Sequence, residues 1–195
     1  MSTGARRTAE DPGAARCREW FERSVRGDVE AFESLYRYLH GGLRRFAETY
    51  VRSPQVAEEI VQDMFLALWQ TRASLRLTRS VKGYFYIGVR NRAINYVKRR
   101  EAERRAGDRL AREEALHEVG NAAEERLTHE EHVAAVRRIV AQLPPRTRQA
   151  YVLYYQHELS YAEIAAVMGT AVKAVEKQLA RALRHIYQRI GSGAR

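Results

Sequence analysis

The chain has 195 residues, and 34 Lys or Arg against 24 Asp or Glu give it a net charge of +10 at pH 7. This charge favours a polyanionic partner, nucleic acid first and an anionic membrane surface second, over a merely soluble basic protein. The single cysteine, Cys17, excludes an internal disulfide and a cysteine-based metal site. No stretch approaches the roughly 20 apolar residues of a membrane span, and a reducing cytoplasm is the expected location.

The periodicity of the apolar residues is helical throughout, with no sustained alternation of period two, and it predicts an all-α protein of two small domains. Residues 1–18 are polar, small and Pro/Gly-bearing, and are expected to form a disordered tail. The first domain is predicted at 19–100. A linker dense in charge and alanine is predicted at 101–131, and the second domain at 132–190.

The first marked helix is predicted to begin after Ser53, its N-cap, with Pro54 in its first turn, and to run to about Gln70. Its core stripe consists of Ala57, Ile60, Val61, Met64 and Leu68. Three large apolar residues lie off that stripe among polar ones, and the whole set is Glu58, Glu59, Gln62, Asp63, Phe65, Leu66 and Trp69. Large apolar groups beside acids on an outward face indicate a protein-docking surface. The alternative is that another helix of the same domain covers them.

Residues 76–100 contain eight Lys or Arg and no acid. A helix opening at Gly83 is predicted, with an apolar face of Phe85, Val89, Ala93 and Tyr96. The opposite face carries Tyr84, Gly88, Asn91, Asn95 and Lys98. An aromatic ring, amides and basic groups together suit melted DNA, because the ring can stack on an unpaired base, the amides can bond to its edge and the cations can hold phosphates. The alternative is a solvated basic helix with Tyr84 in the core.

Further along the chain, helices are predicted at 133–143, with Val133, Val136, Ile139, Val140 and Leu143 as its apolar face, and at 146–156. Pro144 and Pro145 stop the first of them, and the tyrosines of the second are expected in the core and at its rim. Ser160 and Glu163 then form a capping box before a short apolar helix, and Gly169 supplies the positive φ of a sharp stop. A second helix at 171–190 completes a helix-turn-helix unit.

The last helix is predicted to be amphipathic. Its apolar stripe comprises Val172, Val175, Leu179, Leu183 and Ile186. Its basic face comprises Lys173, Lys177, Arg181 and Arg184. This pattern is typical of a recognition helix, in which Lys173, Lys177 and Gln178 reach base edges and the two arginines hold phosphates. The alternative is an ordinary helix with a solvated basic face.

In this order, the segments resemble the sigma-70 family of bacterial RNA polymerase sigma factors, and within it the small, two-domain extracytoplasmic-function group. Residues 57–69 resemble region 2.2, which docks on the polymerase clamp helices. Residues 84–100, centred on Arg90 and Asn91, resemble regions 2.3 and 2.4, which melt and read the −10 element. Residues 143–146 and the helix-turn-helix resemble region 4, which reads the −35 element. The resemblance covers about residues 28–190 and rests on the ordered combination of motifs.

The resemblance implies a non-catalytic protein without metal or cofactor, which binds the clamp and flap of core RNA polymerase and promoter DNA and is controlled by an anti-sigma factor. The core-binding residues are then the seven of residues 58–69 given above. The −10 residues are Lys82, Tyr84, Arg90, Asn91, Asn95, Lys98, Arg99 and Arg100. The −35 residues are Thr170, Lys173, Ala174, Lys177, Gln178, Arg181 and Arg184.

Several positions depart from the family pattern. Tyr84 and Asn95 stand where the family often has Trp and Asp; Tyr keeps a stacking face, so a shifted −10 preference is expected rather than a loss of function. Ala171 replaces the usual Ser or Thr at the start of the recognition helix, where Thr170 could cap one residue earlier. Ala174 replaces a commoner Thr and removes one contact to DNA.

Two other classes of protein fit parts of the sequence. A helix-turn-helix regulator with an unrelated sensor domain would bind DNA without polymerase and would have a ligand pocket in the first block. An enzyme acting on nucleic acid would need a metal or acid–base cluster, but the six histidines are scattered and none is close to Asp63 in the sequence.

Overall fold

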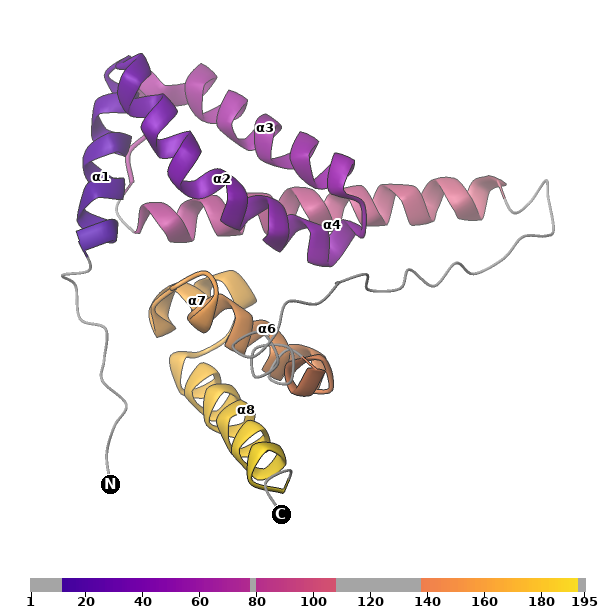
Figure 1. Ribbon diagram of the computed structural model, residues 1–195. Coiled ribbons are helices and arrows are strands. Elements are labelled where there is room, and N and C mark those ends of the chain that lie inside the picture. Colours follow the sequence, from indigo (N-terminus) through magenta and orange to yellow (C-terminus); the bar gives the residue numbers. More distant parts are fainter. Residues whose placement is uncertain (1–11, 78–79, 108–137, 193–195) are drawn as a thin grey trace, which may run out of the picture.

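A computed structural model of the protein describes residues 12–77, 80–107 and 138–192, and these residues form helices and no strand. The first group comprises α1 (Pro12–Val25), α2 (Val29–Val51), α3 (Pro54–Thr71), a short 3₁₀ turn (Arg72–Ser74) and α4 (Val81–Gly107). The second comprises α6 (Pro145–Tyr155), α7 (Tyr161–Met168) and α8 (Val172–Ser192), preceded by a helical stretch at 138–141. The two groups are called the first and second domains below, and the predicted all-α fold is confirmed (Figure 1).

In the first domain α2 packs against α1, α3 and α4, and α3 also packs against α4. The predicted stripes of α3 and α4 supply much of the core, and only Tyr96 among them is half-buried. The largest fully buried side chains here are Leu35, Leu43, Phe46, Val61, Met64, Leu68, Phe85 and Val89. α3 is therefore enclosed on two sides, and this widens the sector that it buries.

The first domain extends beyond both of its predicted ends. α1 begins at Pro12, so the expectation of a disordered tail through residue 18 is wrong for 12–18; the reason is that Cys17 and Phe21 are buried against α2 and α4. α4 continues to Gly107, past the expected end at Arg100, and Arg99 forms an i,i+4 ion pair with Glu103 at 3.7 Å. Residues 108–137, with most of the predicted linker and Val133 and Val136, lie outside the described residues.

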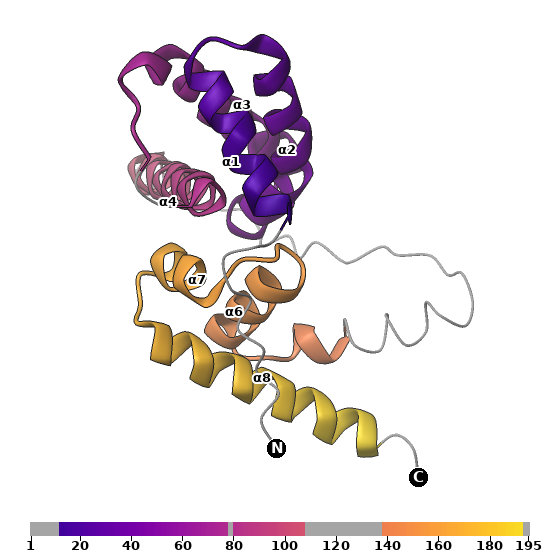
Figure 2. The ribbon, with the colours of Figure 1, turned by 90° about the vertical axis from the view of Figure 1, so that its left-hand side faces the viewer.

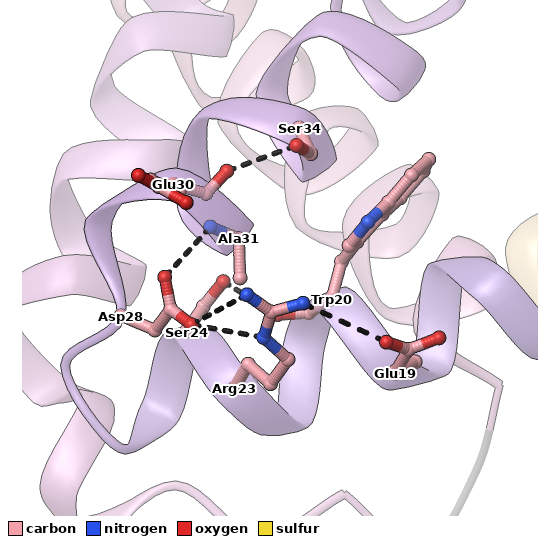
Figure 3. Close-up of polar contacts among 8 residues, drawn as sticks. All are labelled: Glu19, Trp20, Arg23, Ser24, Asp28, Glu30, Ala31 and Ser34. Carbon is pink, nitrogen blue, oxygen red and sulfur yellow. Dashed lines mark hydrogen bonds and ion pairs between the residues drawn. The ribbon is translucent and has the colours of Figure 1, made fainter.

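A polar network fixes the turn between α1 and α2 (Figure 3). Asp28 caps α2, because its Oδ1 accepts from the backbone N–H of Ala31 at 3.0 Å, and its Oδ2 accepts from the Nε of Arg23 at 2.8 Å. These two donors hold the pKa of Asp28 below its usual value. Gly27, at φ 94°, supplies the left-handed residue that reverses the chain.

The second domain contains the predicted helix-turn-helix. Ser160 and Glu163 form both bonds of the capping box of α7, and Gly169 ends that helix at φ 63°. On α8 the predicted apolar stripe is buried at Val175, Leu179 and Ile186 and half-buried at Leu183. Val172 is an exception: it is 41% exposed because it is the first residue of α8, and the buried Ala182 extends the stripe instead.

Candidate polymerase and nucleic-acid interfaces

One exposed face of α3 combines acids with an apolar side chain. Glu59, Gln62 and Asp63 are exposed, and Leu66 beside them is 53% exposed although it is large and apolar. We call these four residues the docking face. An exposed leucine framed by polar groups has the make-up of a protein contact with an apolar centre and a polar rim.

Two aromatic residues predicted for this face lie elsewhere. Phe65 is 2% exposed, so its assignment to an outward surface is wrong: α2 and α4 both cover it, and its ring centroid lies 4.6 Å from that of Phe85 and 4.9 Å from that of Tyr36. Trp69 is half-buried, with Phe32 at 4.9 Å on one side and the guanidinium of Arg72 at 4.3 Å. The alternative of a covering helix therefore applies to Phe65.

Glu58, predicted for the same surface, forms its hydrogen bonds with residues of the first domain. Its two carboxylate oxygens lie 2.8 Å and 2.9 Å from Nε2 of His40, and it also accepts from Gln62 at 3.2 Å. Burial acts to raise the pKa of Glu58, but the hydrogen bonds, that of His40 foremost, outweigh it and the pKa is lowered. Glu58 thus ties α3 to α2 as well as bordering the docking face.

The polar side of α4 presents most of the predicted −10 residues to solvent. The exposed members are Asn91, Asn95, Lys98, Arg99 and Arg100. Arg90 is half-buried, and its guanidinium bonds to Tyr50 and counters the rise that burial causes in the pKa of Tyr50. Tyr84 is also half-buried, edge-on to Phe85 with ring centroids 5.5 Å apart, so part of its ring is open to a stacking partner.

Lys82 does not lie on the open surface predicted for it. Its Nζ sits 5.3 Å from the ring centroid of Tyr38 and 3.9 Å from Oε2 of Glu158, a residue of the second domain, and the residue is 7% exposed. The sequence could not predict this burial, because the covering groups come from α2 and from the loop after α6.

The basic face of α8 is open along its length. Lys173, Lys177, Arg181 and Arg184 are all exposed. The other predicted −35 residues, Thr170, Ala174 and Gln178, are half-buried, and Oε1 of Gln178 accepts from the hydroxyl of Thr147 at 2.6 Å, which leaves only its amide N–H groups for a base edge. The backbone carbonyl of Ala171 accepts the first hydrogen bonds of α8, so the helix begins at Val172.

The two domains meet where α7 faces α4, an arrangement visible in both views (Figure 2). The hydroxyl of Tyr86 on α4 lies 2.9 Å from Nδ1 of His157 in the loop after α6, and both residues are buried. Burial first, and then the charges of Arg45 and Lys82, lower the pKa of His157 to about 4. Sequence analysis missed this pair, because no local pattern links positions 71 residues apart.

A groove of about 1040 Å³ runs along the same boundary. α4 contributes Tyr84, Gly88 and Asn91 to it, and α7 contributes Ala162 and Ala166. Within the described part of the chain, no three His, Cys, Asp or Glu side chains gather closely enough to hold a metal ion. No helix among the described residues has the length and apolarity that crossing a membrane requires.

Comparison with known proteins assigns both domains. The family model of sigma-70 region 2 matches residues 35–118, and that of sigma-70 region 4 matches residues 134–186. The ferric citrate uptake sigma factor FecI of Escherichia coli is 31% identical over 158 residues, which cover 79% of this chain and 87% of that protein. The extracytoplasmic-function sigma factor SigM of Mycobacterium tuberculosis is 28% identical over 167 residues, 86% of this chain and 81% of that protein.

Two solved structures share the fold. CnrH, in complex with the cytosolic domain of CnrY, superposes with a TM-score of 0.57 at 21% identity over 91% of this chain and 98% of CnrH. RpoE of Bartonella quintana, in complex with the anti-sigma factor NepR, has the same TM-score and identity over 84% of this chain and 98% of RpoE. The chain belongs to the extracytoplasmic-function group of the sigma-70 family, the proteins that bind core RNA polymerase and direct promoter-specific initiation of transcription.

Proposed function

We propose that the docking face of α3 binds core RNA polymerase, that α4 reads the −10 element, and that α8 reads the −35 element. The protein acts by binding and positioning, without a catalytic step of its own, in the cytoplasm. The observation that carries this division is the segregation of charge: acids surround an exposed leucine on α3, whereas the polar sides of α4 and α8 present Lys, Arg and amide groups.

On α4, Tyr84 and Asn91 are placed to receive a base that leaves the duplex. The half-buried ring of Tyr84 is held by Phe85, so its free part offers a preorganised stacking surface, and the exposed amide of Asn91 can hydrogen-bond to a base edge. Lys98, Arg99 and Arg100 follow on the same helix and supply phosphate contacts. A stacked base and neutralised phosphates together offset the cost of opening the base pair.

On α8, the basic residues near the start of the helix contact bases, and those further along contact the DNA backbone. Lys173 and Lys177 lie in the first two turns, which enter the major groove most deeply in helix-turn-helix proteins, and Arg181 and Arg184 lie further along toward the backbone. Two modest contacts on one chain raise each other's effective concentration, so the spacing of the two promoter elements becomes part of specificity. CnrH was solved with the cytosolic domain of CnrY and RpoE with the anti-sigma factor NepR, and we include an anti-sigma factor among the partners of this chain.

Run-off transcription on fragmented genomic DNA tests the proposal, with purified core RNA polymerase from the source organism, in the presence and absence of the protein. Discrete transcripts that depend on the protein are expected, and their mapped starts give both promoter elements. Asp63→Ala, in the docking face, should lose most of this activity, whereas Glu33→Ala, an exposed acid on α2, should retain it. No transcript, together with DNA binding that is unaffected by core enzyme, would overturn the proposal in favour of a polymerase-independent regulator.

A further inference from the structure

Arg92 is a half-buried arginine of α4 that none of the predicted sites contains. It lines the groove together with Tyr84, Gly88 and Asn91. At 3.6 residues per turn, these four positions fall within one sector of roughly 100° on the helix. Arg92 lies at the edge of that sector nearest α3, because its guanidinium contacts Met64. It therefore belongs to the same surface as the two residues proposed to receive an unpaired base.

The guanidinium of Arg92 is held through one of its three nitrogens. Nη1 donates to Sδ of Met64 at 3.1 Å and to the carbonyl oxygen of Gly88 at 3.4 Å. An Nη nitrogen carries two N–H groups, so these two acceptors engage both of them. Neither Nε nor Nη2 forms a hydrogen bond with any residue that the structure describes. The side of the guanidinium that carries Nε and Nη2 is therefore available to a ligand.

Gly88 makes this arrangement of Arg92 possible. A Cβ at position 88 would lie 2.5 Å from Sδ and 2.7 Å from Cε of Met64, and 3.5 Å from Nη1 of Arg92. The first two distances are shorter than real Cβ contacts, so the Met64 side chain occupies the space that a side chain at position 88 would fill. Its sulfur reaches the guanidinium through that space. A buried methionine and a helix carbonyl thus orient the guanidinium before any ligand binds.

The available side of the guanidinium of Arg92 has the geometry of a two-pronged donor. Nε–H and one N–H of Nη2 are parallel, and such a pair binds two acceptors that lie side by side. Among the bases, guanine offers this pair in its O6 and N7, whereas adenine presents N7 beside an amino donor. Two oxygens of a phosphate offer the same pair. Arg92 can therefore bind a guanine or a phosphate, and its surroundings decide between them.

The surroundings of Arg92 favour a base. Its side chain reaches back one helical turn toward Tyr84, since it bonds to the carbonyl of Gly88, and Gly88 itself has no side chain to fill the space between them. The charge of Arg92 counters the rise that burial causes in the pKa of Tyr84, which agrees with a guanidinium close to that ring. A planar base can therefore stack on the free part of the Tyr84 ring while its edge meets the guanidinium. A phosphate would leave the aromatic ring unused.

We propose that Arg92 is a specificity-determining residue, whose Nε–H and Nη2–H groups donate to O6 and N7 of an unpaired guanine that stacks on Tyr84. Met64 and Gly88 are positioning residues, because they hold the guanidinium in the orientation that this contact needs. The inference rests on the proposed function for the identity of the surface, and it adds a base preference to that function. The −10 element that this protein reads should therefore contain a guanine in the melted strand.

Transcription from a randomised −10 element tests the guanine preference, with holoenzyme assembled from the full chain and core polymerase. Each promoter variant carries a barcode in its transcript, and the transcripts are counted by sequencing. For the wild type, guanine at one position should give about tenfold more transcript than any other base. In Arg92→Gln the ratio of guanine to adenine should fall below about twofold, because a glutamine amide pairs with N6 and N7 of adenine. Arg92→Lys keeps the charge without the paired donors and should also lose the preference.

Three further measurements separate the base contact from other effects. Arg100→Gln, the matched control on the exposed end of α4, should lower transcription from all sequences alike. Met64→Leu keeps the volume but removes the sulfur acceptor, so the guanine ratio should fall about threefold while the unfolding midpoint stays close to that of the wild type. Replacing the guanine by 7-deazaguanine removes N7; wild-type transcription should fall about fivefold, and that of Arg92→Gln should not change.

The proposal is overturned if no position prefers guanine, or if the preference persists in Arg92→Gln. An equal loss from all sequences in Arg92→Gln also overturns it, because the guanidinium then holds a phosphate. Failure of the proposed function appears separately, as a chain that yields no transcript with core polymerase. In that case fluorescence anisotropy of the full chain with labelled pentathymidylate, carrying a central guanine or 7-deazaguanine, measures the base contact alone. Binding about fivefold tighter to guanine, lost in Arg92→Gln, supports the inference, and equal affinities overturn it.

Discussion

Substitutions at two neighbouring residues of α3 allow the effect on folding stability to be measured apart from the effect on polymerase binding. Phe65 is 2% exposed and touches aromatic rings of α2 and α4, whereas Leu66 is 53% exposed. Replacing a buried Phe by Ala costs about 3–5 kcal/mol. With a urea m-value of about 2 kcal/mol per molar, Phe65→Ala should lower the unfolding midpoint by roughly 2 M. Leu66→Ala should change the free energy of unfolding far less, by about 0.5–1 kcal/mol, because more than half of its surface stays in water on folding.

For affinity to core polymerase, Leu66→Ala should be the variant with the larger effect. Leu66→Ala should weaken binding by about 1–2 kcal/mol, roughly 5- to 30-fold in Kd, since an apolar anchor inside a polar rim carries a large share of interface energy. Val29→Ala is the matched control: Val29 is 56% exposed, is the first residue of α2 and is not part of the docking face. Urea unfolding followed by circular dichroism and binding titration of fluorescent core enzyme give both quantities. Wild-type affinity in Leu66→Ala would refute the docking face, and equal instability of the two variants would refute the burial argument.

Three further predictions concern the second domain. Ser160→Ala should cost about 1 kcal/mol by removing the cap of α7, whereas Ser34→Ala, in the second turn of α2, should cost much less; thermal unfolding measures both. Lys173→Ala should relax sequence preference at one promoter position, while Arg181→Ala should weaken binding to all sequences alike and reduce the salt slope by about 1, as measured by holoenzyme titrations at several salt concentrations. Protonation of His157 is disfavoured while the residue is buried against Tyr86 between the two domains, where its pKa is about 4 against an ordinary 6.5. The packing of the two domains should therefore be fully stable above pH 6.5 and lose up to about 3 kcal/mol as the pH falls to about 4, measured against pH by energy transfer between dyes on Glu33→Cys and Tyr187→Cys; a flat profile would contradict this.

Features set by near neighbours in the chain were predictable from the sequence. The caps at Ser53 and Ser160 and the stop at Gly169 depend on residues at most a few positions apart, and the structure confirms all three. The basic face of α8 follows from the helical period alone. Local chemistry thus suffices where a single helix or turn satisfies its own backbone groups.

Features that depend on packing between distant segments were not predictable. Phe65 was assigned to an outward face, because helical periodicity locates one stripe and does not reveal that α2 and α4 cover α3 from two sides. The helical start of α1 was missed because Cys17 is the one fully buried apolar residue among the described residues before Glu19. The burial of Lys82 and the Tyr86–His157 pair depend on contact between domains, which no local pattern encodes.

The chemistry of the interdomain contact suits reversible opening. Ser80 caps α4 and Glu163 caps α7 with bonds that lie within their own domains, and only the additional bond between the two side chains crosses the boundary. When that bond breaks, water can take its place while both helices keep their caps. Tyr86 and His157 likewise exchange one partner for water without loss of a backbone hydrogen bond. The domains can therefore separate at the cost of a few side-chain contacts and of no backbone hydrogen bond.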